Sequence, residues 1–438
     1  MRTGTTTKRL LKPLSLVAVI FLTVSGGPYG LEPLLQFAGK NGALLLLMVV
    51  PFLWDVPAIL TVLELNSMMP VNGGYYKWVN RALGLRWAFY EGWWSWLYSF
   101  TDLAIYPVLF VTYLSFFFPD IAAYKIPVCL LVIWGSAGLN ILGIVPVGRV
   151  SLILGTIVLV PFFILFGVSF LSPAMHFATP ALSLNGVGFT SIGMGLYTVM
   201  WNFLGWDNTT TYAGEVDKPV RSYLISMGVS FIVVVVVYLL TTYVTQNSGV
   251  DLKELTDKGY PLLGVTIAGR WLGILLSIGG MASALGIFSA VILSISRVPK
   301  ALAEDKLLPK VLGVTHKRFN TPYLAIIVCA VIVSFMVLWT FTDLLVIDVI
   351  LYGAGLFLEF ISLIVLRVNE PDAPRPFKIP LNVFGLSLMM LLPVSVYSIA
   401  LVAVFSQASK MFVPAMFAVC ALVTAEVVWW FVRRMNKW

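Results

Sequence analysis

Long apolar stretches follow one another along almost the whole chain, and short polar joints rich in proline, glycine and charge separate them. A helix needs about 20 mostly apolar residues to cross a bilayer. No polar joint is long enough to hold a folded soluble domain. The pattern therefore predicts a single all-α integral membrane domain over residues 1–438. The twelve predicted spans are roughly 14–37, 42–66, 88–117, 124–145, 148–172, 187–214, 222–245, 263–298, 322–341, 344–367, 383–406 and 411–432.

Two of the predicted spans are interrupted by residues that do not continue a helix. Residues 24–30 (VSGGPYG) interrupt the first span, and residues 201–207 (WNFLGWD) interrupt the sixth. Unwound backbone is tolerated at membrane depth only where protein or a polar cavity pairs its amides and carbonyls. Glycine lets the backbone turn there, and Pro28 is well placed to start the half-helix that follows. A packing kink is the alternative explanation for each break.

The two breaks divide the predicted spans into matching units. Spans one to five (14–172) and spans six to ten (187–367) each open with a broken helix, and the last two spans (383–432) are additions. Because five is an odd number, the second unit must be inverted relative to the first. Breaks at corresponding positions of two halves are typical of a transporter and point to its substrate site.

Composition supports the membrane assignment. The chain is 59% apolar and 11% charged, with a mean hydropathy of +0.94, so a soluble fold would have too little polar surface. Its net charge of +8 is explained by the predicted membrane topology and does not indicate a nucleic-acid-binding surface. With both termini cytoplasmic, 22 of the 28 Lys and Arg residues fall on the inner side, as the positive-inside rule requires. The six outer ones are Lys40, Lys125, Lys253, Lys258, Arg270 and Lys410.

Motifs for other kinds of chemistry are missing from the sequence. There is no glycine-rich phosphate loop, so we do not expect ATP-driven pumping. His176 and His316 fall in loops on opposite sides, and the three cysteines fall inside spans, so neither a metal site nor a disulfide is predicted. We expect no enzymatic activity and no cofactor. The expected neighbours are lipid headgroups of a plasma or inner membrane, and a monomer and a homodimer both remain open.

Acidic residues inside the predicted spans indicate what the chain binds. An ionised group near the bilayer centre costs about 2.5–3.5 kcal/mol on insertion scales, so it usually lines a cavity or a pathway. Glu32 follows Pro28 by one helical turn, and Asp207 ends the second break. The third span carries a polar stripe at helical spacing, for which hydrogen bonding between helices is the alternative. The stripe consists of Glu91, Ser95, Ser99, Asp102 and Tyr106.

Four more acids lie in predicted spans. Asp348 and Glu359 could serve in proton transfer or substrate binding, whereas Asp55 and Glu426 are expected to be structural or peripheral. No Lys or Arg in the spans evidently neutralises the candidate acids, which favours a cationic substrate. Trp201 and Trp206 could close over it by cation–π contact, worth about 2 kcal/mol when desolvated, or could face lipid instead.

Each candidate substrate-binding residue either lies at or beside one of the two breaks or is an acid or a tyrosine inside a predicted span. They are Ser25, Gly26, Gly27, Tyr29, Glu32, Asp102, Tyr106, Trp201, Asn202, Trp206, Asp207 and Glu359.

Three segments at the ends of predicted spans resemble signatures of the amino acid–polyamine–organocation (APC) superfamily. They are 64–78 (ELNSMMPVNGGYYKW), 213–221 (AGEVDKPVR) and 296–309 (SRVPKALAEDKLLP), the last leading into Asn320-Thr321-Pro322. Within the superfamily, 25–32 (SGGPYGLE), 102–109 (DLAIYPVL), 201–215, 358–360 (LEF) and 371–380 (PDAPRPFKIP) are most similar to plant and protozoan polyamine uptake permeases.

The resemblance implies an inverted five-plus-five (LeuT-type) fold and uptake driven by an ion gradient. It implies backbone contacts from Ser25, Gly26 and Gly27, an aromatic gate at Trp201, and a substrate contact at Asp102, where the arginine/agmatine exchangers carry an amide. One feature departs from the pattern. Many proton-coupled carriers place a lysine in the fifth helix, but this chain reads VLVPFF at 158–163, so the coupling ion stays unassigned.

The leading hypothesis is a secondary transporter that takes up polyamines such as putrescine or spermidine by alternating access, with a proton as the coupling ion. An amino acid carrier or exchanger of the same fold is the nearest alternative. There the amides of the first break would bind the α-carboxylate, and the acids would select a basic side chain. A channel, or a sensor or partner subunit that does not transport, is the alternative from another class.

Overall fold

The computed structural model describes residues 10–180, 182–406 and 412–436. Lys410, which the positive-inside count assigns to the outer side, lies outside these residues. The described chain is helical, and its only extended pairings are two isolated bridges, Leu11 with Val216 and Asn72 with Tyr212. The all-α class is therefore confirmed for the part of the chain that the structure describes.

Nine helical segments of the described residues are long and apolar enough to cross a membrane, which agrees with a multi-pass membrane protein. Several of these segments join more than one helix. They are α2 Glu32–Val50 continued by the π-turn η1 Pro51–Asp55 and α3 Val56–Met68; α5 Leu85–Leu114; η2 Pro119–Tyr124 with α6 Lys125–Ile141; α7 Ile144–Ser169; α9 Pro219–Asn247; α12 Arg270–Ile295 with α13 Arg297–Glu304; α15 Phe341–Asn369; α16 Val383–Phe405; and α17 Phe412–Asn436.

Shorter helices complete the chain. Two of them, α1 Pro13–Val24 and α14 Tyr323–Met336, are apolar but too short to cross alone. α8 Phe189–Trp201 precedes the second break. The remaining short helices are α4 Gly74–Leu83, α10 Leu252–Lys258 and α11 Tyr260–Ala268.

Two predicted span boundaries differ from the structure, one at a glycine and one at the second break. The predicted turn between the first two spans is present, because the non-helical Gly39 (φ 68°) separates two helical stretches within the bounds of α2. The eighth span begins at Arg270 rather than 263, because Gly269 (φ 89°) ends α11 as a separate helix. The sixth span is α-helical only as far as Trp201; beyond it lie short 3-10 turns at Asn208–Thr211 and Ala213–Glu215.

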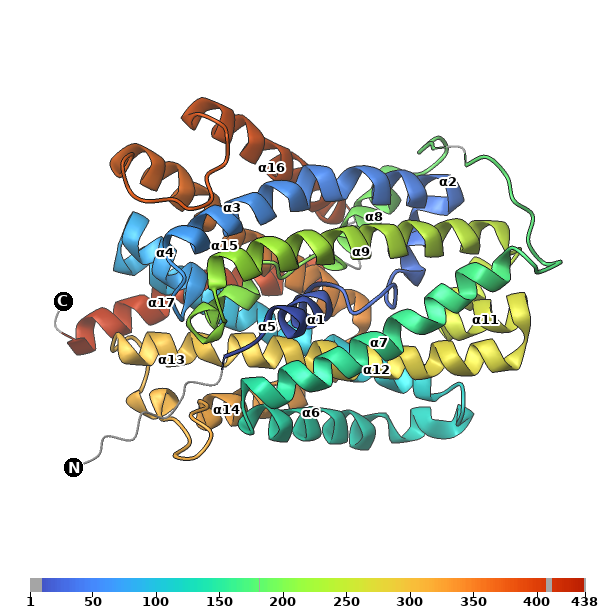
Figure 1. The fold of residues 1–438 in the computed structure, drawn as a ribbon, viewed down its shortest axis with the longest axis horizontal. Coiled ribbons are helices and arrows are strands. Elements are labelled where there is room, and N and C mark those ends of the chain that lie inside the picture. Colours follow the sequence, from blue (N-terminus) through green and yellow to red (C-terminus); the bar gives the residue numbers. More distant parts are fainter. Residues whose placement is uncertain (1–9, 181, 407–411, 437–438) are drawn as a thin grey trace.

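The helices form an elongated bundle (Figure 1). α1 lies inside it and contacts α7, α9 and α12, while α5 packs against both α12 and α15. We call the end where α17 finishes and where α4 and α13 lie the terminal face, and the opposite end, with α10 and α11, the distal face (Figure 1).

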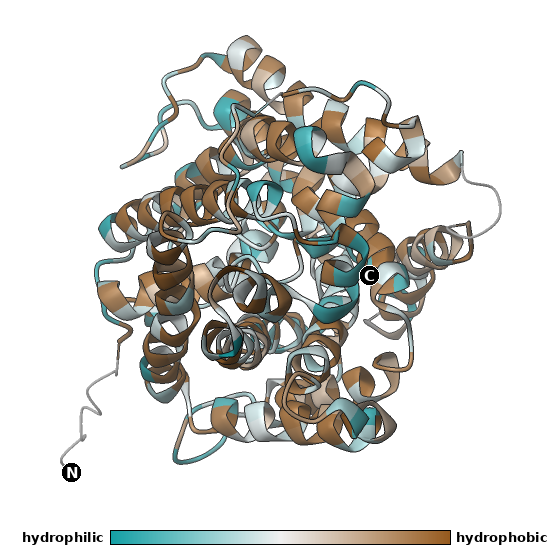
Figure 2. Ribbon diagram, turned by 90° about the vertical axis from the view of Figure 1, so that its right-hand side faces the viewer, coloured by the Kyte–Doolittle hydropathy of each residue, from teal (hydrophilic) through white to brown (hydrophobic). Residues whose placement is uncertain are grey.

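Apolar side chains cover the outside of this bundle. Phe384, Leu391 and Val402 on α16 are each more than half exposed, and most helices are hydrophobic along their length, with hydrophilic residues gathered in loops and at helix ends (Figure 2). A soluble protein rarely exposes so much contiguous apolar surface. The outer helices therefore present their apolar faces to lipid.

Candidate functional site

The first break is an unwound segment whose backbone conformation requires glycine at three positions. Gly26, Gly27 and Gly30 have φ values of 61°, 93° and 97°, in the left-handed region that favours glycine. A Cβ on Gly26 would lie 2.3 Å from Ile287, and one on Gly27 would lie 2.6 Å from Val158. Unwound backbone is therefore held tightly between α12 and α7.

The helix after this break does not begin where the sequence suggested. We expected Pro28 to start it, but α2 begins at Glu32 with Pro33 in its first turn. Pro28 instead lies in a turn, where its carbonyl accepts the Leu31 amide at 3.0 Å. A proline fits either place, since its fixed φ suits both a turn and a first helical position.

The second break lies directly against the first. A Cβ on Gly30 would be 2.7 Å from the indole of Trp201, and the Asn202 amide group donates to the Gly30 carbonyl at 3.4 Å. Gly205 has φ 96°, and its amide donates to the Tyr352 hydroxyl of α15 at 3.3 Å. Two segments far apart in the sequence thus meet in the interior of the bundle.

A small cavity opens where the two breaks face α5 and α15. It has room for about one water molecule. Its lining comes from the end of α1, from α5, from the second break and from α15: Thr23, Val24, Tyr98, Asp102, Tyr106, Trp201, Leu204, Gly205, Asn208 and Asp348.

Two carboxylates dominate the cavity. The Tyr106 hydroxyl donates to Asp102, and Thr101 Oγ1 lies 3.3 Å from Asp348 Oδ1. Asp348 Oδ2 has no hydrogen-bond partner in the described part of the chain. Both side chains are buried, at 7% and 0% exposure, and the lining contains no Lys or Arg within the described residues. Uncompensated negative charge in such a place attracts a cation.

Aromatic rings bound the same cavity. The Trp201 indole stacks on Tyr106 with ring centroids 6.2 Å apart, and the edge of Phe341 meets it at 5.5 Å. Tyr98 donates to Asn208 Oδ1 at 2.6 Å on another wall. Ring faces beside carboxylates suit an organic cation, because they add cation–π attraction and contact with methylene groups.

Glu32 and Tyr29 lie outside the cavity, towards the distal face. The Glu32 carboxylate accepts the Gly30 amide at 2.7 Å and the Tyr113 hydroxyl at 2.9 Å. The Tyr29 hydroxyl donates to the Leu276 carbonyl at 2.7 Å, and its ring packs on Tyr113 and Phe162. In this arrangement, Glu32 stabilises the first turn of α2, where an acid is favourable.

Asp207 and Glu359 belong to a separate group of acids closer to the terminal face. Asp207 Oδ1 accepts the Tyr352 hydroxyl at 2.7 Å. Neither acid lines the cavity.

Trp206 points elsewhere again. Its indole nitrogen donates to Asp55 Oδ1 at 3.2 Å, which gives Asp55 a structural partner. Glu426 is peripheral, in an exposed ion pair with Arg86.

The residues around the site that we did not select from the sequence have recognisable positions. Tyr98 precedes Asp102 by one turn of α5, and Asn208 directly follows the second break. Asp348 was recognised as an intramembrane acid but not assigned to the site. Tyr238 on α9 carries no sequence signal; its hydroxyl lies 2.6 Å from Ser25 Oγ.

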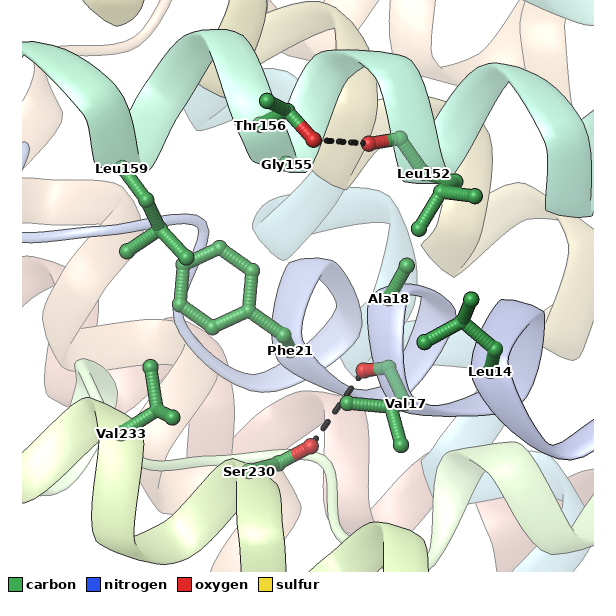
Figure 3. Close-up of a pocket in the computed structure, with 10 residues that line it drawn as sticks. All are labelled: Leu14, Val17, Ala18, Phe21, Leu152, Gly155, Thr156, Leu159, Ser230 and Val233. Atoms are coloured by element: carbon green, nitrogen blue, oxygen red, sulfur yellow. Dashed lines mark hydrogen bonds between the residues drawn. The ribbon is translucent and has the colours of Figure 1, made fainter.

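A second and larger cleft has the wrong chemistry for a cation. It lies between α1, α7 and α9 (Figure 3) and is lined by Leu14, Val17, Ala18, Phe21, Leu152, Gly155, Thr156, Leu159, Ser230 and Val233. Its two hydroxyls are already used, since Thr156 donates to the Leu152 carbonyl and Ser230 to the Val17 carbonyl. Apolar chains fit such a surface, and ammonium groups do not.

The three signature segments meet at the terminal face. The Gly214 amide donates to Asn72 Oδ1 at 2.9 Å, and Arg297 pairs with Glu215 at 2.8 Å. Tyr76 and Lys77 both reach Asp305, at 2.6 and 2.7 Å.

The Tyr76 contact remains a hydrogen bond rather than a charge pair. Burial, together with the neighbouring Asp305 carboxylate, raises the pKa of Tyr76 above its ordinary value, so its hydroxyl stays a donor. Polar contacts therefore join these distant segments at the terminal face.

Comparison with known proteins places the chain among transporters. The Amino acid permease family model matches residues 11–429. Polyamine transporter RMV1 of Arabidopsis thaliana is 33% identical over 87% of this chain and 78% of its own length. Polyamine transporter PUT1 of Oryza sativa subsp. japonica is 33% identical over 90% of this chain and 74% of its own. Serine/threonine exchanger SteT of Bacillus subtilis (strain 168) is 22% identical over 86% of this chain and 87% of its own. The chain thus belongs to the amino acid permease family of the APC superfamily, a family of membrane transporters rather than enzymes.

Proposed function

We propose that this chain is a secondary active transporter that takes up polyamines, and that the cavity between the two breaks is its substrate site. The observation that most directly supports this proposal is that Asp102 and Asp348 face one buried cavity, which has no cationic side chain among its described lining residues. An ammonium group would replace that missing charge, and its three N–H donors suit carboxylate and hydroxyl oxygens.

The backbone of the first break favours a cation over a carboxylate. The amides of Ser25 and Gly26 donate to the Phe21 carbonyl, and the Gly27 amide donates to Ser25 Oγ at 3.0 Å. In the described part of the chain, the carbonyl oxygens of the same three residues accept no hydrogen bond. Carbonyl oxygens attract an ammonium group, whereas a substrate carboxylate would have to displace bonds already made.

Trp201 is the proposed aromatic gate of this site. It belongs to the second break, touches Gly30 of the first, and stacks on Tyr106 across the cavity. Because the cavity is smaller than a diamine, binding requires the breaks to move apart around the acids. Movement of Trp201 with the second break would then open and close the cavity.

For the whole fold we propose twelve spans in an inverted five-plus-five arrangement, with units at about 14–172 and 187–367 and additional helices at 383–432. Both termini would be cytoplasmic in a plasma or inner membrane, so the terminal face would be the inner one. Alternating access then follows if the contacts closing the terminal face and the aromatic packing around Glu32 release in turn. A proton is the proposed coupling ion, and the assembly is a monomer or homodimer.

An amino acid exchanger remains the second candidate, because the serine/threonine exchanger is also a relative over most of the chain. Labelled putrescine uptake into proteoliposomes, with spermidine, arginine and leucine as competitors, separates the two. We expect spermidine to compete and leucine to have no effect. Inhibition by leucine alone would overturn the polyamine proposal, and linear, unsaturable flux would indicate a channel.

A further inference from the structure

Three carboxyl groups lie together beside the substrate cavity but are not part of it. Glu91 on α5, Asp207 in the second break and Glu359 on α15 are 1%, 3% and 0% exposed. Glu91 precedes Asp102 by eleven residues on α5, which corresponds to about 16 Å along a helix. Glu359 likewise follows Asp348 by eleven residues on α15. Because α5 and α15 pack together, the acids form two levels, one at the cavity and one nearer the terminal face.

The carboxyl groups of the second level lack cationic partners. Asp207 and Glu359 lie within hydrogen-bond distance of each other, and each lies close to Glu91. Neither oxygen of Glu359 receives an N–H or O–H donor from the described residues, and neither does Glu91 Oε2. Two charged carboxylates repel strongly in a buried place, so this contact requires a proton or another cation.

An unpartnered hydroxyl points to the same spot. Tyr75 on α4 is fully buried and lies close to Asp207, Glu91 and Glu359, with Ser95 as a further polar neighbour, but its hydroxyl has no hydrogen bond of normal geometry to a described residue. Tyr75 is not a carboxylic acid, so its buried hydroxyl is evidence for a ligand site that does not depend on the three carboxyl groups. It can donate to a carboxylate when one forms and accept from a carboxylic acid.

The groups around this level leave it without a positive charge. Two α5 residues lie beside these acids: Ser95, which donates to Glu91 at 3.1 Å, and Tyr98. On α15, Tyr352 donates to Asp207. Acids on neighbouring helices are already paired, Glu64 of α3 with Arg367 and Arg375, and Glu426 of α17 with Arg86.

Close packing favours a proton over an ammonium group as the ligand. A Cβ added at Gly355 of α15 would lie 2.9 Å from Glu91 Oε1, so the two helices touch at this level. None of the three acids lines the substrate cavity. A proton needs no volume, whereas an ammonium group needs about the space of a water molecule.

We propose that Glu91, Asp207 and Glu359 bind the proton whose movement drives transport. The proposal rests on the proposed function, since it assigns the coupling ion of the same transporter. The proton enters from water on one side, is held between carboxyl oxygens of Asp207 and Glu359, and leaves as a proton to the other side. No other bond is formed or broken.

Asp207 connects this proton to the substrate site. It lies in the second break, two residues after Gly205 and one before Asn208, and both of these residues line the cavity. Tyr352 contacts both Asp207 and the Gly205 amide. Loss of the proton leaves two negative charges in contact, and their repulsion moves the broken segment that carries Trp201.

The test compares exchange with accumulation in proteoliposomes that contain the full chain. Glu359→Gln imitates a permanently protonated carboxyl. We expect it to retain labelled-putrescine counterflow at equal pH while losing accumulation driven by an acid exterior at least tenfold, and to lose the proton uptake reported by an internal pH dye. Glu91→Gln should change the same two readouts in the same direction. Glu426→Gln, at an exposed ion pair, is the matched control and should accumulate putrescine as the wild type does.

Each result has a distinct meaning. Gradient-driven accumulation and proton uptake at wild-type levels in both variants would overturn the proton site. A folded Glu359→Gln protein that no longer binds putrescine in a thermal-shift titration would make Glu359 a substrate ligand and would also overturn it. No putrescine counterflow in the wild type would overturn the proposed function instead. If Glu359→Gln does not fold, unchanged proton coupling in Glu91→Gln alone is sufficient to overturn the site.

Discussion

The hydroxyl of Tyr238 lies 2.6 Å from the Oγ of Ser25. The same hydroxyl is 3.1 Å from the Asn202 carbonyl, so one side chain of α9 contacts both broken segments. Ser25 Oγ in turn accepts the Gly27 amide at 3.0 Å. A single buried network thus fixes the two unwound segments relative to each other.

Removing that hydroxyl should loosen the site without removing any charge. Tyr238→Phe leaves the ring in place against Phe203 and deletes only the bridge, which is worth about 1 kcal/mol. We expect putrescine affinity to fall about fivefold in a thermal-shift titration, with both breaks still formed. Tyr243→Phe on the same helix, whose hydroxyl makes an exposed 3.4 Å bond, is the control and should have no effect. Equal effects of the two variants would contradict the proposed role.

Neutralising one cavity acid should weaken the binding of every polyamine. Asp102→Asn keeps the shape of the side chain and its contact with Tyr106 but removes the charge. A hydrogen bond to a charged group contributes about 1.5–3 kcal/mol, so affinity should fall about ten- to hundredfold. Calorimetric titration with putrescine measures the loss. Asp120→Asn, at an exposed acid in η2, serves as the control, and an unchanged dissociation constant for Asp102→Asn would exclude the cavity as the cation site.

The positions of the breaks could be predicted from local sequence, because both contain glycine, whereas a single proline such as Pro107 or Pro161 stays inside its helix. The breaks at 24–30 and 201–207 are both observed. The polar stripe of α5 is buried in full, as its helical spacing indicated. These features depend on the residues of one segment alone.

Which acids lie together depends on how separate helices pack. It could therefore not be predicted from the residues of any one segment. Glu32, Asp102 and Asp207 were expected to surround one substrate, yet only Asp102 lines the cavity. Which acids share a level depends on how α5 lies against α15. One signal was available: each helix carries two acids eleven residues apart, which is about three turns and therefore the same face.

A methyl group at Gly30 should disable the gate. In Gly30→Ala the new Cβ would lie 2.7 Å from the Trp201 indole, and the residue would have to keep φ near 97°, where alanine costs about 1–2 kcal/mol. We expect the protein to be made and inserted but putrescine counterflow to fall at least tenfold. Gly167→Ala in α7 meets nothing within 4 Å and is the control. Normal counterflow in Gly30→Ala would show that the breaks need not stay in contact.

The buried ion pair of Glu64 with Arg367 should affect the stability of the fold more than the chemistry of transport. Glu64 is fully buried and accepts from Arg367 at 2.5 and 2.7 Å and from the Ile379 amide at 2.8 Å. Glu64→Gln leaves buried guanidinium charge without its partner, which typically costs about 3–5 kcal/mol. The thermal midpoint in detergent should therefore fall well below that of Glu370→Gln, which breaks the exposed Arg81 pair, worth at most about 1 kcal/mol. Equal midpoints for the two variants would mean that water reaches Glu64 and screens it, and the terminal face would then be open rather than closed.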